Sequence, residues 1–352
     1  MTELLDLLKE MLSASGLSGF EGPIREIIRE AWEPLTEELS VSKIGSLHGL
    51  KKGQGKQPRK RVLISAHMDA IGMMVTEVEA GLMRVTGIGG LDHRILPGQP
   101  VTVHGRKDLP GVVVQPPGHL LPESAGDGPV EMKYLFVDVG LRPDEVARHV
   151  RVGDTVSYAQ QPLELTGEAL AGHTLDNRVS VAATTLCLEA LQNRFHNWDV
   201  WAVASAQEEE TLGGALTSPF DIRPDIAIII DVCFAKGQGS SDWRSLPFGE
   251  GVGIGYGPNI HPALYDSFEK KAQALEIPYH RDLMPKMSGT DAMAVQIVAE
   301  GIPCAVLGIP LRYMHTPVET VSLKDIRRAG RLMAEFIADL QPDALDQINW
   351  EE

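Results

Sequence analysis

The sequence is poor in aromatic residues and in positive charge, and both shortages exclude classes of function. Aromatic residues make up 5% of the 352 residues, which is little material for stacking bases or sugar rings. The 32 Lys and Arg residues are outnumbered by 48 Asp and Glu residues, which gives a formal net charge of -16. Because a nucleic-acid partner requires a basic face, we expect no such partner.

Long apolar runs and paired cysteines are also missing. No apolar run approaches the ~18 residues of a membrane span, so we expect no membrane partner. The first twelve residues (MTELLDLLKEML) predict an acidic amphipathic helix and not a signal peptide, because they lack a basic start and an apolar block. Cys187, Cys233 and Cys304 are far apart and odd in number, which indicates buried thiols in a reducing, cytoplasmic compartment.

The length, hydrophobic content and strand pattern of the sequence are typical of an α/β protein with a β insertion. Hydrophobic residues make up 43%, enough for a sizeable core, and the length allows about two domains. Short β-type runs alternate with Gly and Pro between residues 71 and 165, which predicts a small barrel-like β domain. Residues 1–70 and 166–352 then form one discontinuous α/β domain. Apolar patterns predict strands that include residues 41–50, 62–66, 200–206 and 224–230.

One of these strands delivers acidic residues to its carboxyl end. Residues 200–206 lead into Gln207 and then into Glu208, Glu209 and Glu210. In an open α/β sheet, ligands bind beyond the carboxyl ends of the strands. Adjacent carboxylates repel one another unless a positive charge lies among them. A solvated acidic loop is the alternative interpretation.

Other ligand-type side chains occupy comparable positions. His67 and Asp69 follow the strand at 62–66, and because strand side chains alternate, Asp69 can orient the His67 ring. Asp231 ends the strand at 224–230, where opening a turn is the alternative role.

Asp176 and His315 are two further candidate metal-ligating residues. Asp176 precedes a helix that begins at Val179, so capping that helix is its alternative role. His315 follows a core strand that begins at Cys304.

Together these residues are two imidazoles and three carboxylates at the ends of elements of one sheet: His67, Asp176, Glu209, Asp231 and His315. The ligand types suit zinc, with cobalt or manganese as alternatives. Five ligands are too many for one catalytic zinc, but they fit two metals ~3.5–4 Å apart that share one carboxylate. Neighbouring residues at a strand end point apart, so Glu208 would be free to act as the general base.

The order of motifs resembles the tetrahedral dinuclear aminopeptidases, a family with glutamyl and leucyl aminopeptidases and proteins labelled endoglucanase M. The motifs are AHMDAIGMMV, GHTLDNR, QEEETLGGA, IIDVCFAKG, SGTDA and RYMHTPVE, and the resemblance covers essentially the whole chain. It implies a mixed-sheet, phosphorylase/hydrolase-like zinc-exopeptidase domain with helices on both faces. It also implies that the β insertion mediates dimerisation and that dimers assemble into a dodecamer.

The resemblance also assigns roles to the candidate residues. It implies that His67, Asp176 and Asp231 hold one metal ion. Glu209 and His315 hold the other, with Asp176 shared between the two. Glu208 matches the general base, and Asp69 matches the residue that orients the His67 ring.

The chain departs from the family pattern at a few positions, and none of them removes a ligand or the base. Glu210 and Thr211 stand where the family usually has Val-Gly, Ser46 where it often has Asn, and Thr316 where it often has Ser. We therefore expect a metal-dependent aminopeptidase for short peptides, with its preference for the N-terminal residue open. A glycan hydrolase and a non-enzymatic assembly scaffold are the alternatives. Glycosidases need two carboxylates and no metal, which fits this His-containing set poorly.

Overall fold

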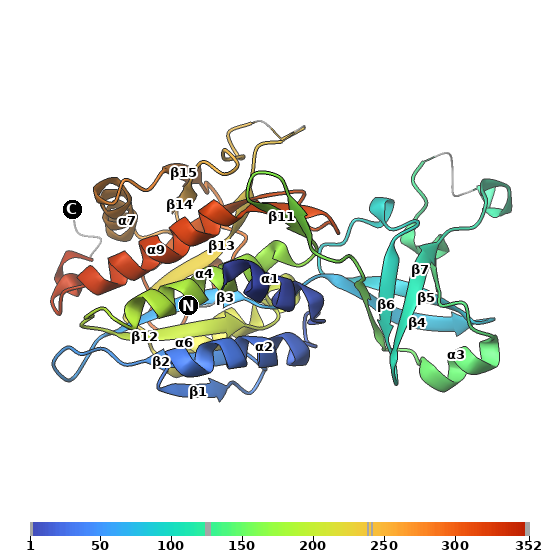
Figure 1. The fold of residues 1–352 in the computed structure, drawn as a ribbon, viewed down its shortest axis with the longest axis horizontal. Coiled ribbons are helices and arrows are strands. Elements are labelled where there is room, and N and C mark those ends of the chain that lie inside the picture. Colours follow the sequence, from blue (N-terminus) through green and yellow to red (C-terminus); the bar gives the residue numbers. More distant parts are fainter. Residues whose placement is uncertain (1–2, 124–127, 238, 241, 349–352) are drawn as a thin grey trace.

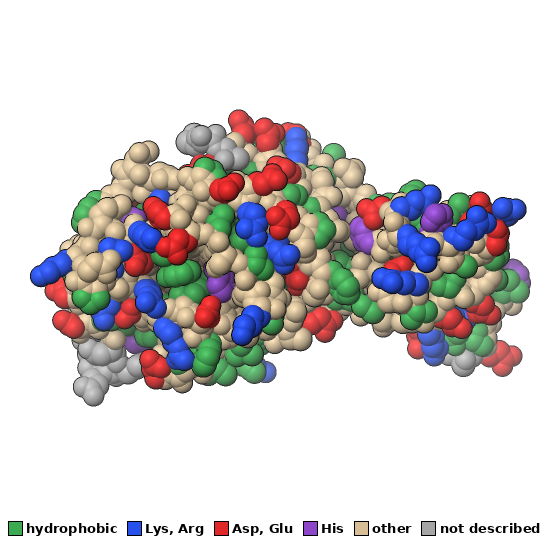
Figure 2. Space-filling view, turned by 90° about the horizontal axis from the view of Figure 1, so that it is seen from below, with side chains coloured by type: hydrophobic (Ala, Val, Ile, Leu, Met, Phe, Trp, Pro, Cys, Tyr) green, Lys and Arg blue, Asp and Glu red, His purple; other side chains and the backbone are tan. Residues whose placement is uncertain are grey.

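Two bodies of unequal size make up the protein (Figures 1 and 2). Each body has its own apolar core. The computed structural model describes residues 3–123, 128–237, 239–240 and 242–348. Within these residues the larger body holds an 11-stranded sheet and the smaller body a closed six-stranded barrel. Trp32, Ile64 and Leu188 belong to the core of the larger body, whereas Met73 and Val137 belong to that of the barrel.

The large sheet is mixed: four strands at its centre are parallel, and the pairs outside them are antiparallel except for β14 with β15. The parallel strands run in the order β12-β3-β13-β16. Because all four are parallel, their carboxyl ends lie at one edge of the sheet. The strands of this sheet are β1 (Glu38–Val41), β2 (Leu47–Lys51), β3 (Arg61–His67), β10 (Leu163–Leu165), β11 (Ala169–Gly172), β12 (Asp199–Ser205), β13 (Ile226–Phe234), β14 (Val252–Tyr256), β15 (Tyr279–Leu283), β16 (Cys304–Arg312) and β17 (Glu319–Ser322).

Helices cover both faces of this sheet, as the resemblance implied. Helices α4 and α9 lie in front of the sheet in Figure 1, and α6 lies behind it. The last helix places apolar residues at helical spacing, and Ile326, Ala329 and Met333 are fully buried against the core. The helices are α1 (Leu4–Ser13), α2 (Gly22–Trp32), α3 (Pro143–His149), α4 (Leu175–Leu191), α5 (Glu208–Thr211), α6 (Gly213–Ile222), α7 (Pro262–Ala274), α8 (Ala292–Val295) and α9 (Leu323–Asp339).

The barrel is closed by antiparallel pairs in the order β4-β5-β8-β7-β6-β9. Alternating residues of these strands point inward and fill the barrel with Val and Met side chains. We propose the barrel as the inserted domain; β10, which follows it, already pairs with β11 in the large sheet. The barrel strands are β4 (Gly72–Glu79), β5 (Leu82–Ile88), β6 (Pro100–His104), β7 (Asp108–Val114), β8 (Phe136–Asp138) and β9 (Thr155–Tyr158).

Two local expectations need correction. The predicted strand at 41–50 is instead a hairpin of β1 and β2, because a turn closed by the Ser42 N–H and the Ser46 carbonyl interrupts it. Asp231 does not end its strand, since β13 continues to Phe234 in register with β16. Asp231 therefore projects from within a paired strand, which fixes its backbone more firmly than a turn would.

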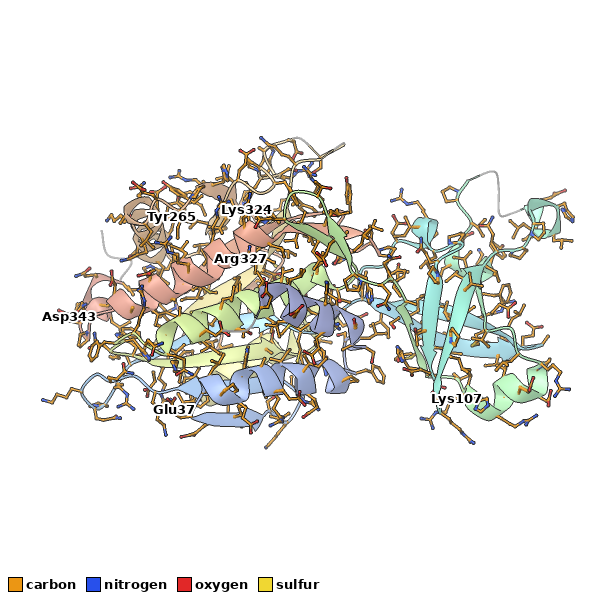
Figure 3. All side chains as sticks on the ribbon, viewed as in Figure 1. Glu37, Lys107, Tyr265, Lys324, Arg327 and Asp343 are labelled. Carbon is orange, nitrogen blue, oxygen red and sulfur yellow. The ribbon has the colours of Figure 1, made fainter. Side chains whose placement is uncertain are left out.

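The cysteines, the helices and the charged side chains of the described residues are as the composition leads one to expect. All three cysteines are buried and free, as expected. None of the helices in the described part of the chain combines the length and apolar character needed to cross a bilayer. Charged residues such as Lys107 in the barrel and Arg327 on α9 project from the surface (Figure 3).

Candidate active site

His67 lies at the carboxyl end of β3, between the neighbouring strands β12 and β13. It pairs in register with Ser205 of β12. The Nδ1 atom of its buried ring lies 3.2 Å from the carbonyl oxygen of Asp69 and 3.6 Å from the Asp69 carboxylate. Nδ1 is thus turned toward Asp69, which leaves Nε2 directed toward the cavity.

Glu208 and Glu209 lie on the short helix α5 and not on an extended strand end. The expectation that strand alternation separates them is therefore wrong, because consecutive residues of a helix diverge by its ~100° turn instead. The Asp69 carboxylate accepts the backbone N–H groups of Glu208 at 3.0 Å and of Glu209 at 3.2 Å. Asp69 consequently fixes both the imidazole and the first turn of this helix.

Asp176 does not cap a helix with its side chain. Its backbone torsions are non-helical, and no side-chain cap bond forms at the start of α4. Its two carboxylate oxygens face different histidines: Oδ1 lies 3.2 Å from His67 Nε2, and Oδ2 lies 3.3 Å from His315 Nε2. This buried carboxylate therefore lies between two groups of donor atoms.

Asp231 completes the group of donor atoms on the His67 side of Asp176, and His315 belongs to the group on the other side. Asp231 Oδ1 lies 3.7 Å from His67 Nε2, and Glu209 Oε2 lies 3.5 Å from His315 Nε2. The His315 Nδ1 faces the Gly90 carbonyl of the barrel at 3.0 Å, so Nε2 is left for the cavity. Donor atoms that lie within 4.8 Å of one another define three overlapping sets: His67–Asp176–Asp231, Asp176–Glu209–His315 and His67–Glu208–Glu209.

These side chains share a cavity of about 550 Å³, in which the ionised acids repel one another. Burial raises the pKa of Glu208 to about 7 and that of Glu209 to about 8. Burial likewise raises the pKa of Asp231 well above its usual value. The hydrogen bond to Asp176 raises the pKa of His315 to about 10.

The donor set fits divalent cations. Among the ion pairs of the described residues, Asp176, Glu208, Glu209 and Asp231 pair only with the two histidines. Two buried and two partly buried carboxylates without a Lys or Arg partner are costly unless metal ions neutralise them. Carboxylate oxygen and imidazole nitrogen are the donors that zinc, cobalt and manganese accept.

Three buried acids that the sequence reasoning missed support the site. Glu319 accepts the backbone N–H of Asp176 at 3.1 Å and that of His315 at 2.8 Å. Asp291 accepts the Ser65 and Ser205 hydroxyls at 2.7 and 2.6 Å beneath the strand ends. The third, Glu21, accepts the Gln207 N–H just before α5. Glu319 and Asp291 stand within the quoted motifs RYMHTPVE and SGTDA, but no role in the site was assigned to either residue from the sequence.

One departure from the family pattern links the barrel to the site. The Glu210 carboxylate accepts the backbone N–H of Gly89, and the next residue, Gly90, contacts His315. The barrel segment therefore touches a candidate ligand directly.

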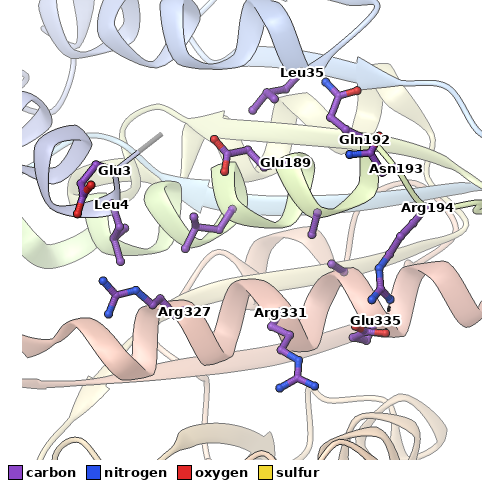
Figure 4. A pocket seen from close by; sticks show the side chains of 13 residues that line it. Glu3, Leu4, Leu35, Glu189, Gln192, Asn193, Arg194, Arg327, Arg331 and Glu335 are labelled. Atoms are coloured by element: carbon purple, nitrogen blue, oxygen red, sulfur yellow. Dashed lines mark hydrogen bonds and ion pairs between the residues drawn. The ribbon is translucent and has the colours of Figure 1, made fainter. Parts of the chain in front are cut away.

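A second cavity, of about 840 Å³, lies away from these residues between α4 and α9 (Figure 4). Leu4 and Leu186 contribute to its apolar lining, and Arg194 pairs with Glu335 at one end. Although it is the larger of the two, it lacks histidine and convergent buried carboxylates. The chemistry is therefore assigned to the smaller cavity.

Known proteins resemble this chain over nearly its full length. A lysyl aminopeptidase of Pyrococcus furiosus is 33% identical over 96% of this chain and 97% of its own. The structure of a TET aminopeptidase from the marine sediment archaeon Thaumarchaeota archaeon SCGC AB-539-E09 superposes with a TM-score of 0.92. It is 28% identical and covers 98% of this chain and 99% of its own.

A TET1 peptidase of Pyrococcus horikoshii, described as assembling into a tetrahedron or a large octahedral shell, superposes with a TM-score of 0.84. It is 26% identical and covers 96% of this chain and 100% of its own. These likenesses confirm the mixed α/β fold that the motifs implied. The family model described as M42 glutamyl aminopeptidase matches residues 45–332. The chain therefore belongs to the M42 glutamyl aminopeptidase family.

Proposed function

We propose that the protein is a two-metal aminopeptidase that removes N-terminal residues from short peptides. The observation that carries this proposal is the position of Asp176, whose two carboxylate oxygens face two different histidines at 3.2 and 3.3 Å. A carboxylate in this position can bridge two ions, and a bridged pair is typical of aminopeptidase centres.

The residues divide into two ligand sets and one free acid. His67, Asp176 and Asp231 would hold one ion, and Asp176, Glu209 and His315 would hold the other. When bound, the two ions would supply Lewis acidity toward the peptide carbonyl and the attacking water. Glu208 also lies near His67, at 3.8 Å, but both sets are complete without it.

Glu208 would act as the general base. Its carboxylate would take a proton from water as the oxygen attacks the scissile carbonyl carbon. As the C–N bond breaks, Glu208 would return that proton to the leaving amine. Asp69 supports this role because it holds the backbone of Glu208 and the ring of His67 in fixed positions.

We also propose that the chain forms a homo-oligomer through the barrel. The P. horikoshii TET1 peptidase is described as assembling into a tetrahedron or a large octahedral shell, and this chain covers all of its length. Light scattering of the purified protein tests this proposal: a dodecamer supports it, and a monomer at micromolar concentration contradicts it.

The activity itself is tested by chelation and reconstitution on aminoacyl-anilides. Chelated protein should lose turnover, and zinc, cobalt or manganese added separately should restore it. N-acetylated substrates are the control, because an aminopeptidase requires a free amine. Metal-independent hydrolysis of cellulose would favour a glycan hydrolase, and no turnover with any metal on a broad anilide panel would favour a scaffold.

A further inference from the structure

A fifth carboxylate, outside the two ligand sets, lines the cavity of the candidate active site. Asp282 lies on β15, next to β14 at one edge of the large sheet (Figure 1). Asp282 is only 8% exposed and contributes to the same 550 Å³ cavity as Glu208 and Asp231. Among the described residues, its side chain forms neither a hydrogen bond nor an ion pair. Buried carboxylates are rarely left without a partner unless a ligand supplies one.

Two glycines allow this carboxylate to lie close to the candidate ligands. A methyl group on Gly308 would lie 3.3 Å from Asp282 Oδ2, and one on Gly253 would lie 3.3 Å from Asp282 Cβ. Gly308 pairs in register with Asp231 on the neighbouring strand. The carboxylate of Asp282 therefore lies against Gly308 of β16, the residue that pairs with Asp231 of β13.

The charges in the cavity leave Asp282 without compensation. Two divalent ions would balance the four negative charges of Asp176, Glu208, Glu209 and Asp231. Burial raises the pKa of Asp282 to about 6, which reflects the cost of an isolated charge at this position. A cation bound in the cavity would remove that cost.

The surrounding side chains can accommodate a long aliphatic stem but supply no competing cation at this depth. Phe234, Met284 and Met314 line the same cavity with apolar atoms. Arg244 also lines it, but its side chain is 68% exposed and its guanidinium pairs with Asp242. Lys286 is exposed at the mouth of the cavity. A Lys or Arg side chain packs its methylene groups on apolar surface while its charge reaches a polar partner.

We propose that Asp282 binds the cationic side chain of the substrate's N-terminal residue, so that the protein selects peptides beginning with Lys or Arg. This inference rests on the proposed aminopeptidase function, and it adds the substrate class that the motifs left open. Asp282 acts here as a specificity-determining residue and takes no part in the proton transfers.

Two measurements on the metal-loaded protein test the proposal. The first is kcat/KM for lysyl-, arginyl-, leucyl- and glutamyl-anilides. Wild type should prefer the two cationic substrates. Asp282→Asn should lower kcat/KM for them by about 10- to 100-fold, mainly through KM, and leave the leucyl substrate within about twofold. Asp282→Glu should restore part of the preference. Asp266→Asn, an exposed change on α7 with the same loss of charge, is the matched control and should change nothing.

The second measurement is calorimetric binding of lysinamide and norleucinamide, which differ in the side-chain ammonium group. Wild type should bind lysinamide at least about tenfold more tightly, and Asp282→Asn should remove the difference. An equal loss of activity on all four anilides would overturn the proposal, because it would place Asp282 in the shared chemistry. Equal binding of the two amides by wild type would also overturn it. Selective binding without turnover would instead contradict the aminopeptidase function and leave the cation subsite standing.

Discussion

The carboxylate of Glu319 accepts the backbone N–H of His315 at 2.8 Å through Oε1, while its Oε2 accepts the backbone N–H of Asp176. One fully buried acid thus fixes the main chain at a candidate ligand of each set. Both oxygens are needed as acceptors, because each backbone donor would otherwise be buried without a partner.

Replacement of Glu319 by Gln should therefore weaken metal binding. The amide keeps one acceptor oxygen and turns an NH₂ group toward the second N–H donor. We expect zinc affinity to fall by about 10- to 100-fold, as for other groups that orient ligands. Competition with a chromophoric chelator measures the affinity. Glu300→Gln on the surface is the control, and unchanged affinity in Glu319→Gln would show that the contact does not position the ligands.

Glu208 and Glu209 are adjacent in sequence but should respond differently to the same substitution. Glu208→Gln should lower kcat by a factor of at least about 10²–10⁴, because the base is lost, and should retain both metal ions. Glu209→Gln should lose metal, because a ligand is weakened. Turnover and metal content of the two variants, measured side by side, check the assignment. Full activity of Glu208→Gln would refute the role of the base.

The shared position of Asp176 predicts the metal stoichiometry of two other variants. His315→Ala should reduce the content from two ions per subunit to one, because only the set with Glu209 loses a donor. Asp176→Ala should weaken both ions, since each oxygen faces a different set. Elemental analysis after dialysis measures the content. Two retained ions in His315→Ala would remove that residue from the ligand set.

The pKa of Asp282 predicts how stability depends on pH. Burial raises its pKa from 3.8 to about 6 in the folded chain, so the protonated form suits the fold and ionisation is costly. The stability that the raised pKa gives the wild type is fully present below pH 3.8 and is lost as the pH rises through about 6. Asp282→Asn cannot ionise and escapes this loss. Its gain over wild type should be near zero at low pH and reach about 3 kcal/mol above pH 6.

Urea unfolding of the metal-free protein at several pH values between 4.5 and 8 measures this difference. Asp266→Asn again serves as the control, because that side chain is exposed in the fold. A constant difference across the pH range would show that Asp282 is not held in a site that disfavours its charge.

The sequence by itself predicted the central strands and the residues at their ends. The apolar runs before His67 and Glu208 have the length and composition of strands buried on both faces. The barrel was likewise visible as short β-type runs punctuated by Gly and Pro. These signals are local, since each depends on a few consecutive residues whose hydrophobicity and backbone preferences act together.

Local sequence patterns gave the wrong backbone position for residues whose conformation is set by strand pairing or by a helical turn. Asp231 seemed to end a strand by its polarity, yet pairing with β16 carries the strand to Phe234. Glu208 and Glu209 were expected on extended backbone, but Gln207 adopts a left-handed conformation and starts α5. In both cases hydrogen bonds to distant segments decided the local backbone.

Only the tertiary structure decided which oxygen of Asp176 faces which histidine, and that Asp282 enters the cavity without a partner. Glu319 closes the motif RYMHTPVE, but only the folded chain shows that it is buried and accepts two backbone N–H groups. The sequence tells which type of side chain stands at each position. The burial and the partners of that side chain depend on segments more than a hundred residues away, which come together only when the sheet assembles.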